Sequence, residues 1–343
     1  MQTNQGSTIY SKAIRWWKYP LLVLVMMVLL GCALSTPTST PNPTPTSTVP
    51  PTSTPTSTPP PQGEFDLTAD QDQLALLLHL LSFVPGGDSQ AAFLNTRAVQ
   101  QNPDLSESRS EFSLENLGLA EISSPDIADS LESLVLSTAE DGRELIIVLN
   151  GHISIDALLQ DLRGRGISMG TAPEIYRSYK VWHSSPSAPS AMSLTAVDNT
   201  TLVLARAAPI AGNGVAAARL QDALDAFDGV TPGLLDYPEV LQLANNLPSG
   251  FATVVDRDCR GIFPIMEGCA AAGGSGQVVG PSETATTLLA VFGNETQAMA
   301  AMPELRETFE GVEVDVHQKG SLVWTSLFIP PLFISQMLEG FSP

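Results

Sequence analysis

Three pairs of apolar segments, each joined by a short polar turn, limit what this chain can fold into. The segments are 133–138 with 144–149, 193–197 with 201–205, and 312–317 with 322–328. Asp141-Gly142, Asp198-Asn199 and Lys319-Gly320 lie at the turns, and Asp-Gly is a strong signal of a tight β-hairpin. Because a hairpin joins antiparallel strands, the sequence predicts a body built on antiparallel sheet.

Helical periodicity alternates with these extended segments. A stripe of leucines at helical spacing follows Asp70 and ends before Pro85: Leu74, Leu77, Leu78 and Leu81. Helices and antiparallel strands in one chain indicate the α+β class. We therefore expect antiparallel sheets with helices on one face.

Parts of the body resemble one another at fixed offsets. Residues 222–230 align with 304–312, with three acids, a Phe, a Gly and a Val in register, and 145–151 align with 288–294. A strand, a helix and a returning strand thus recur at about 143–183, 200–230 and 284–328, which predicts two or three related β-α-β-β modules. Chance similarity between amphipathic segments is the alternative.

The best internal boundary is Leu247-Pro-Ser-Gly250, which ends one helical segment and precedes the next extended one. We expect an α+β module with an amino-terminal helix at 64–247. A second α+β module, with an insertion bounded by cysteines, is expected at 248–343.

The amino terminus has the layout of a secretory signal. Three bases, Lys12, Arg15 and Lys18, precede an unbroken apolar run at 21–30 and a small-residue junction. Leu29-Leu-Gly-Cys32 resembles the lipobox of bacterial lipoproteins, although Leu30 stands where a small residue is more usual. The resemblance covers about the first 32 residues. It implies a signal peptide at 1–31, an acylated Cys32 that carries palmitate, and a place on the extracytoplasmic face of the cell membrane.

An uncleaved signal anchor is the alternative interpretation of this segment. A membrane span needs about 20 apolar residues, whereas the apolar stretch from Tyr19 to Leu34 has 16. Both interpretations export the body and leave it tethered.

A spacer follows the cysteine, and residues 32–63 form a low-complexity linker. From Ser35 to Pro61 there are 27 residues, of which 10 are Pro and 15 are Ser or Thr. Such a segment has nothing to bury and no charges to pair, so we expect it to be disordered and extended, reaching about 80 Å. Its Ser/Thr density also suits O-glycosylation.

The charge of the chain is concentrated after this linker. Residues 1–31 hold three bases and no acid, so the chain from Cys32 onward has 13 bases against 36 acids, a net charge of −23. Phosphate backbones and anionic surfaces repel such a body. We expect no nucleic-acid partner; the expected partners are the membrane, through the anchor, and an unspecified protein or small-molecule ligand.

The remaining two cysteines form an even pair. If Cys32 carries lipid, Cys259 and Cys269 are left in an oxidising compartment, where a disulfide is favoured. A metal site or free thiols are the alternatives.

One motif raises the question of catalysis. Gly166-Ile-Ser168-Met-Gly170 matches the five-residue pattern of a hydrolase nucleophile elbow, which requires a strand, a sharp turn and a helix in that order. Here a helical segment precedes the motif and an extended segment follows it. His183 or His317 could supply a base, but nothing in their spacing forces either of them toward Ser168.

The sequence suggests no metal or cofactor site. None of the four histidines has a partner at zinc spacing, and His79, set among leucines, is expected to be a partly buried helix residue.

The glycine-rich run 273–276 is expected to be a flexible loop beside the disulfide. The acid triplets at 222, 225 and 228 and at 304, 307 and 310 are expected to be solvated helix faces, with weak cation binding as the alternative. The apolar tail, 327–338, is expected to dock on its own sheet, with a partner surface as the alternative.

These expectations combine into one functional hypothesis. We expect a lipid-anchored, surface-exposed binding or envelope-associated protein that acts without catalysis, with no catalytic, cofactor or metal residues assigned. One alternative is a secreted hydrolase that uses Ser168. The other is a solute-binding lipoprotein of a transporter, which would need two α/β lobes around a cleft.

Overall fold

A computed structural model describes residues 70–140, 142–185, 188, 190–208, 213–260, 266–280, 283–309 and 314–339. Residues Asp66–Pro343 form one compact unit. The signal segment, Cys32 and the linker lie outside the described residues.

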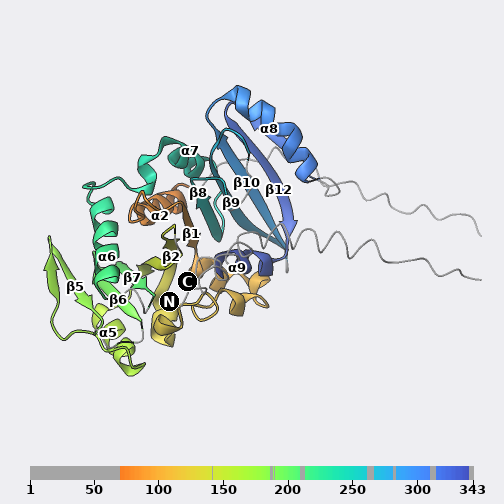
Figure 1. Ribbon diagram of the computed structural model, residues 1–343. Coiled ribbons are helices and arrows are strands. Elements are labelled where there is room, and N and C mark those ends of the chain that lie inside the picture. Colours follow the sequence, from red (N-terminus) through yellow and green to blue (C-terminus); the bar gives the residue numbers. More distant parts are fainter. Residues whose placement is uncertain are drawn as a thin grey trace, which may run out of the picture. The chain divides into compact units, whose positions relative to one another are not determined.

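Twelve strands within the described residues form a single antiparallel sheet (Figure 1). Their order across the sheet is β11-β12-β10-β9-β8-β1-β2-β3-β7-β6-β5-β4. The strands are β1 (Gln90–Leu94), β2 (Leu131–Thr138), β3 (Glu144–Gly151), β4 (Glu174–Tyr176), β5 (Tyr179–His183), β6 (Ala191–Ala196), β7 (Thr201–Ala207), β8 (Ala252–Asp256), β9 (Cys269–Gly280), β10 (Glu283–Phe292), β11 (Val316–Lys319) and β12 (Leu322–Ile329).

Helices of varied length connect these strands. They are α2 (Gln71–Leu81), α3 (Thr96–Gln101), α4 (Pro125–Ser130), α5 (Ile155–Gly164), α6 (Asn213–Phe227), α7 (Pro238–Asn246), α8 (Glu295–Thr308) and α9 (Pro331–Glu339). Short 3-10 turns join them at η3 (Pro103–Leu105), η4 (Arg109–Phe112), η5 (Ala120–Ile122) and η6 (Leu234–Asp236). In the described part of the chain, no helix is both long and apolar enough to cross a bilayer.

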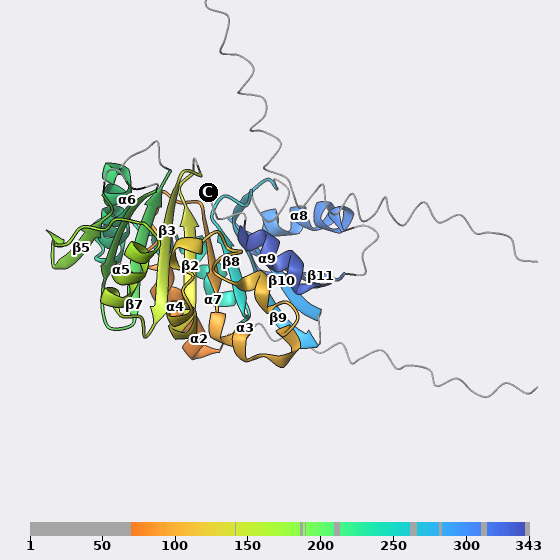
Figure 2. The ribbon, with the colours of Figure 1, turned by 90° about the horizontal axis from the view of Figure 1, so that it is seen from below.

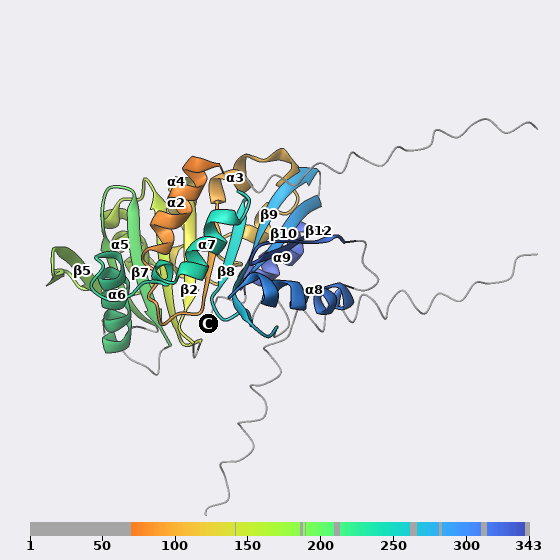
Figure 3. The ribbon, with the colours of Figure 1, turned by 90° about the horizontal axis from the view of Figure 1, so that it is seen from above.

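The α+β class and the antiparallel sheet are confirmed, but helices cover both faces of the sheet rather than one. Helices α2, α6 and α7 share one apolar cluster (Figure 3), while α3, α4, α5, α8 and α9 contribute to another (Figure 2). The physical reason lies in the strands. Leu145, Ile147 and Leu149 of β3 belong to the second cluster, and Ile146 and Val148 to the first. A strand that is apolar at every position must be covered on both sides.

All three predicted hairpins are present as β2–β3, β6–β7 and β11–β12. Asp198 shows how the second turn forms, because its carboxylate accepts hydrogen bonds from the backbone N–H groups of Thr200 and Thr201, at 2.7 and 2.8 Å. Burial acts to raise the pKa of Asp198, but these hydrogen bonds lower it below its usual range.

The strand order repeats on either side of the sheet's centre, where β1 pairs with β8. On one side β1, β2 and β3 lie next to one another, and α5 then leads to the edge hairpin β4–β5. On the other side β8, β9 and β10 are followed by α8 and the edge hairpin β11–β12. The hairpin β6–β7 and helix α6 have no counterpart on the second side among the described residues.

The glycine-rich run was expected to be a flexible loop, and this expectation is wrong: residues 273–276 lie inside β9. A Cβ on Gly273 would lie 2.7 Å from the carbonyl oxygen of Val254 and 3.0 Å from Leu247 beside α7. A Cβ on Gly276 would meet Ile334 of α9 at 2.6 Å. Glycine is therefore needed here for close packing, because a helix approaches the backbone of β9 on each side.

The apolar tail forms the end of β12 and helix α9. Ile334 and Leu338 are buried against the sheet, as the docked arrangement predicts. Leu332 on the same helix is 44% exposed, so part of the tail remains on the surface.

Candidate ligand-binding groove

A groove of about 620 Å³ lies between α5 and the β4–β6 end of the sheet. This volume is within the range of small-molecule sites, about 300–1,000 Å³. The lining residues are Ile155, Asp156, Leu159, Arg163, Thr171, Pro173, Ser178, Lys180, Trp182 and Ala196. They combine an apolar base with exposed polar side chains at the rim.

Helical and strand periodicity place these side chains on facing walls. Ile155, Leu159 and Arg163 lie four residues apart on α5, so they share one side of the helix. Lys180 and Trp182 lie two residues apart on β5 and therefore share one face of that strand. Trp182 is half-buried and packs against the core while it also lines the groove.

Two cations lie in the groove of this acidic molecule. One terminal nitrogen of Arg163 donates to the carbonyl of Gly170 at 3.1 Å, which holds the guanidinium at the rim. Within the described residues, Lys180 forms no ion pair with a carboxylate. Asp156, in the first turn of α5, is the only acid in the lining, so the groove carries a net positive charge.

The hairpin β4–β5, which forms one wall, is attached to α6 on the other face of the sheet. Tyr176 donates a hydrogen bond to Asp225 at 2.8 Å, and Tyr179 donates one to Asp228 at 2.8 Å. Arg177, in the turn with φ 52°, forms an ion pair with Asp225 at 2.9 Å. The wall of the groove is thus held in place by Asp225 of α6 and by Asp228, which directly follows the helix.

These contacts change the interpretation of the first acid triplet. Asp225 and Asp228 are not merely solvated, because they accept hydrogen bonds from the hairpin. Burial raises the pKa of Asp222, and the nearby Arg219 opposes that shift. In the second triplet, Glu304 and Glu307 are exposed on α8, as expected, and the third position lies outside the described residues.

Burial raises the pKa of Tyr179 to about 12, and the hydrogen bond to Asp228 adds to the shift. The protonated phenol is the form that donates to the carboxylate. The contact between hairpin and helix is therefore complete at neutral pH.

His183 lies between a serine and a carboxylate. Its Nδ1 is 2.8 Å from Ser193 Oγ, and its Nε2 is 3.4 Å from Glu174 Oε2. Three neighbouring strands bring these groups together, which sequence spacing alone did not predict. Ser193 is completely buried, so no substrate carbonyl can reach its hydroxyl, and the arrangement orients the imidazole rather than activating a nucleophile.

The structure places Ser168 beside the end of β5, where Met169 forms a bridge with Ser184 and the N–H of Gly170 donates to the carbonyl of His183 at 2.9 Å. The turn that holds Ser168 follows helix α5 and precedes β4, the reverse of the order that an elbow needs. Its backbone carbonyl accepts a hydrogen bond from Ser185 N–H at 2.6 Å. Among the described residues, no hydrogen bond joins the Ser168 hydroxyl to His183 or His317.

The other histidines also lie apart. His79 is partly buried, as expected, with its ring edge-on to Phe83 and Phe227. His317 stacks on Trp324 of the neighbouring strand. In the part of the chain that the structure describes, no group of three or more His, Cys, Asp or Glu side chains is arranged to hold a metal.

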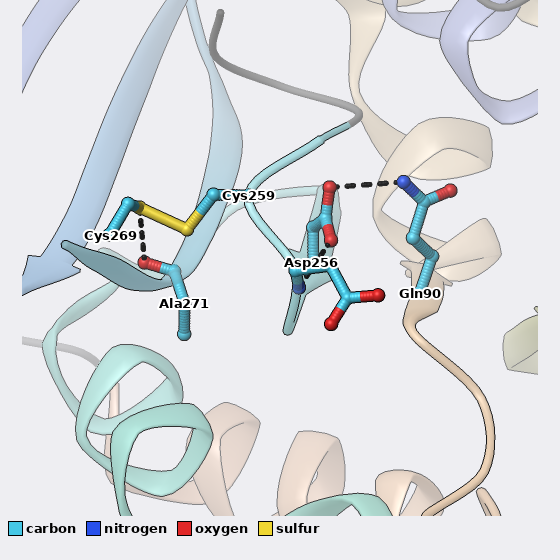
Figure 4. The surroundings of a disulfide bond; sticks show 6 residues. Gln90, Asp256, Cys259, Cys269 and Ala271 are labelled. Carbon is cyan, nitrogen blue, oxygen red and sulfur yellow. Dashed lines mark hydrogen bonds between the residues drawn. A yellow bond between two sulfur atoms is a disulfide. The ribbon is translucent and has the colours of Figure 1, made fainter. Parts of the chain in front are cut away.

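Cys259 and Cys269 are joined by a disulfide, with Cα atoms 6.2 Å apart, at the connection from β8 to β9 (Figure 4). Asp256, at the end of β8, is completely buried and accepts a hydrogen bond from Gln90 of β1 at 3.0 Å. The crosslink therefore closes a loop next to the centre of the sheet rather than next to the groove.

The structure also contains a buried ion pair that sequence reasoning missed. Arg219 of α6 contacts Asp88, whose carboxylate also accepts a hydrogen bond from Ser137 at 2.5 Å. The Asp88 and Arg219 side chains are 1% and 6% exposed. Burial raises the pKa of Asp88, and Arg219 opposes the shift. Because 131 residues separate the two partners, no local pattern could have paired them.

Comparison with known proteins shows similarity in fold alone. No family model matches the chain, and no curated protein matches it. The structure is similar to that of TP0453 in crystal form III, with a TM-score of 0.50 and 10% identity, over 76% of this chain and 97% of that one. Crystal form I of TP0453 gives a TM-score of 0.48 at 10% identity, over 77% and 98% of the two chains.

Proposed function

We propose that this chain is an exported, lipid-anchored binding protein of the cell envelope that holds its ligand in the groove and performs no catalysis. The groove carries the proposal, because it combines a half-buried aromatic side chain, two cations and a polar rim in one concave site. The anchor would keep the body on the extracytoplasmic face of the membrane.

The amino-terminal sequence supports export and anchoring. The lipobox-like Leu29–Cys32 supplies an acylation site, and the Pro/Ser/Thr linker after it supplies a spacer. The disulfide between Cys259 and Cys269 is consistent with an oxidising compartment.

The two alternatives have less support from the geometry. A hydrolase would need a base within reach of Ser168, and a transporter's solute-binding protein would need two lobes around a cleft. The described strands instead form one continuous sheet, and among the described residues no hydrogen bond joins the Ser168 hydroxyl to His183 or His317.

Anchoring is tested by mass spectrometry of the mature protein and of a Cys32→Ser variant. We expect an acylated Cys32 as the first residue, and retention of the unprocessed precursor in the variant. A mature chain that still begins at an unmodified Met1 would refute the anchor.

Binding in the groove is tested by thermal-shift measurements against a panel of saccharides, amino acids and short peptides. Compounds that stabilise the full chain should lose their effect in Trp182→Ala and keep it in Trp324→Phe, because Trp324 lies on β12 outside the groove. Stabilisation that survives Trp182→Ala would place the binding site elsewhere.

A further inference from the structure

We infer that the ligand of the groove is an anionic saccharide, with a sugar ring stacked on Trp182 and its acidic group bound by Arg163 and Lys180. The inference rests on the proposed function, because it names the class of ligand for the same groove. It follows from three features of the lining, taken in turn.

The first feature is charge. The body has a net charge of −23, yet the groove holds two cations and one acid. Arg163 lines the groove from α5 and Lys180 lines it from β5, so the two cations come from facing walls. A guanidinium and an ammonium both form strong hydrogen bonds with carboxylate or phosphate oxygens. Two cations beside one acid favour an anionic ligand over a neutral or cationic one.

The second feature is the aromatic side chain. Trp182 packs against the core, which limits its rotation, and it also lines the groove. A fixed indole offers a flat apolar surface at low entropic cost. The C–H face of a sugar ring matches such a surface, while the hydroxyl groups of the ring point outward to the polar rim.

The third feature is the rim itself. Asp156, Thr171 and Ser178 are all exposed and line the groove, and their oxygens can accept hydrogen bonds from sugar hydroxyls. Together with Arg163 and Lys180 they make five polar side chains in the lining. Such a lining suits a hydrated, polar ligand better than an apolar ligand. A nucleic acid is a poorer fit, because its closely spaced phosphates would be repelled by the acidic body.

The chain supplies matched controls for both cations. Lys319 lies on β11, the edge strand at the opposite end of the sheet from β4, and it has the same chemistry as Lys180. Arg306 lies on α8, which leads to the second edge hairpin as α5 leads to the first. Neither Lys319 nor Arg306 lines the groove.

The experiment is isothermal titration calorimetry of the full chain in detergent micelles with trigalacturonate as the probe. Lys180→Gln and Arg163→Gln should each weaken binding about tenfold, because each removes one charge-assisted hydrogen bond. Lys319→Gln and Arg306→Gln should leave it unchanged. Trp182→Ala should abolish binding, Trp182→Phe should retain part of it, and added salt should weaken it.

Two further probes separate the possible outcomes. If the uncharged methyl ester of trigalacturonate binds as well as the acid, and only Trp182→Ala matters, the groove is a binding site but its ligand is not anionic. If a short oligoglutamate binds through Arg163 and Lys180 and the saccharide does not, the ligand is an acidic peptide. Both results overturn the inference and leave the proposed function standing. Binding of trigalacturonate that no groove variant changes would overturn the inference and also count against the groove as the site.

Discussion

Asp88 and Arg219 form a buried ion pair, and the pair contributes to the stability of the fold only while both partners are present. Arg219 also faces Asp222 and lies 3.9 Å from Glu144. Two charges removed from water are costly, and their attraction offsets that cost only while both remain. The pair therefore provides a sharp test at the residue scale.

We predict that Arg219→Met lowers the free energy of unfolding by about 3–5 kcal/mol at pH 8, because it leaves a buried carboxylate uncompensated. Without Arg219 the pKa of Asp88 rises further, so its folded-state value lies above its unfolded value. The stability that the protonated Asp88 carboxyl group contributes is then present at low pH and is lost as the pH rises through its folded pKa. The loss in Arg219→Met should accordingly be smaller at pH 5 than at pH 8 in urea titrations.

The double variant Asp88→Leu/Arg219→Met is the control for this prediction. Replacing both charges by apolar side chains leaves neither uncompensated, so the double variant should be more stable than Arg219→Met alone. Equal stabilities of the two variants would show that the pair is not coupled.

Tyr179 gives a second test at this scale. Its folded pKa of about 12 lies above the usual value of a tyrosine, about 10. Its contribution to stability is therefore complete below about pH 10 and is lost as pH rises through about 12. Asp228→Asn should lower this pKa but leave it above the usual value, because burial remains.

The measurement is the absorbance of the phenolate at 295 nm, taken as the difference between each protein and its Tyr179→Phe counterpart. Glu304→Gln, at an exposed position of α8, should leave the titration unchanged. A Tyr179 pKa that is insensitive to Asp228→Asn would contradict the proposed attachment of the hairpin to α6.

Strand β9 shows that residues without a side chain can be required inside a strand. The run 273–276 carries little β propensity, yet it lies in the sheet because α7 and α9 pack directly on its backbone. A side chain at these positions would push a helix away from the sheet.

We predict that Gly273→Ala lowers the free energy of unfolding by about 1–3 kcal/mol, because its Cβ would clash with the backbone carbonyl of Val254. Gly280→Ala, at the end of the same strand, should have little effect, since the nearest atom to its Cβ is 3.9 Å away. Urea titration of the two variants tests the difference. Equal stabilities would mean that β9 is not packed as described.

Over the whole molecule, the main electrostatic feature is the excess of acidic over basic side chains. A net charge of −23 after Cys32 means that the folded state brings many like charges together. Salt screens this repulsion over a distance of about 10 Å at 0.1 M. Most exposed pairs, such as Arg97 with Glu132, contribute too little to offset it.

We predict that the melting temperature rises by several degrees, on the order of 1 kcal/mol of stability, as NaCl increases from low concentration to about 0.15 M. Differential scanning calorimetry at fixed pH is the measurement. A neutral solute at the same osmolality should give a smaller rise. A melting temperature that falls with salt would mean that attractive ion pairs outweigh the repulsion.

Features that depend on neighbouring residues could be predicted from the sequence. Tight turns such as the one at Asp198 arise from local hydrogen bonds, and so the hairpins and the α+β class could be predicted. The expected lipid anchor depends on a short motif at Cys32, which needs no folded context to be recognised.

Contacts between residues that are distant in the chain could not be predicted in this way. The groove lies between α5 and β5, which are near one another in the chain, but the wall that carries Lys180 and Trp182 is held by hydrogen bonds to Asp225 and Asp228, each 49 residues from its tyrosine partner. Helices cover both faces of the sheet, and Asp88 meets Arg219 across 131 residues, for the same reason. Burial and long-range pairing minimise the free energy of the whole molecule, and a local pattern carries no information about which surfaces will meet.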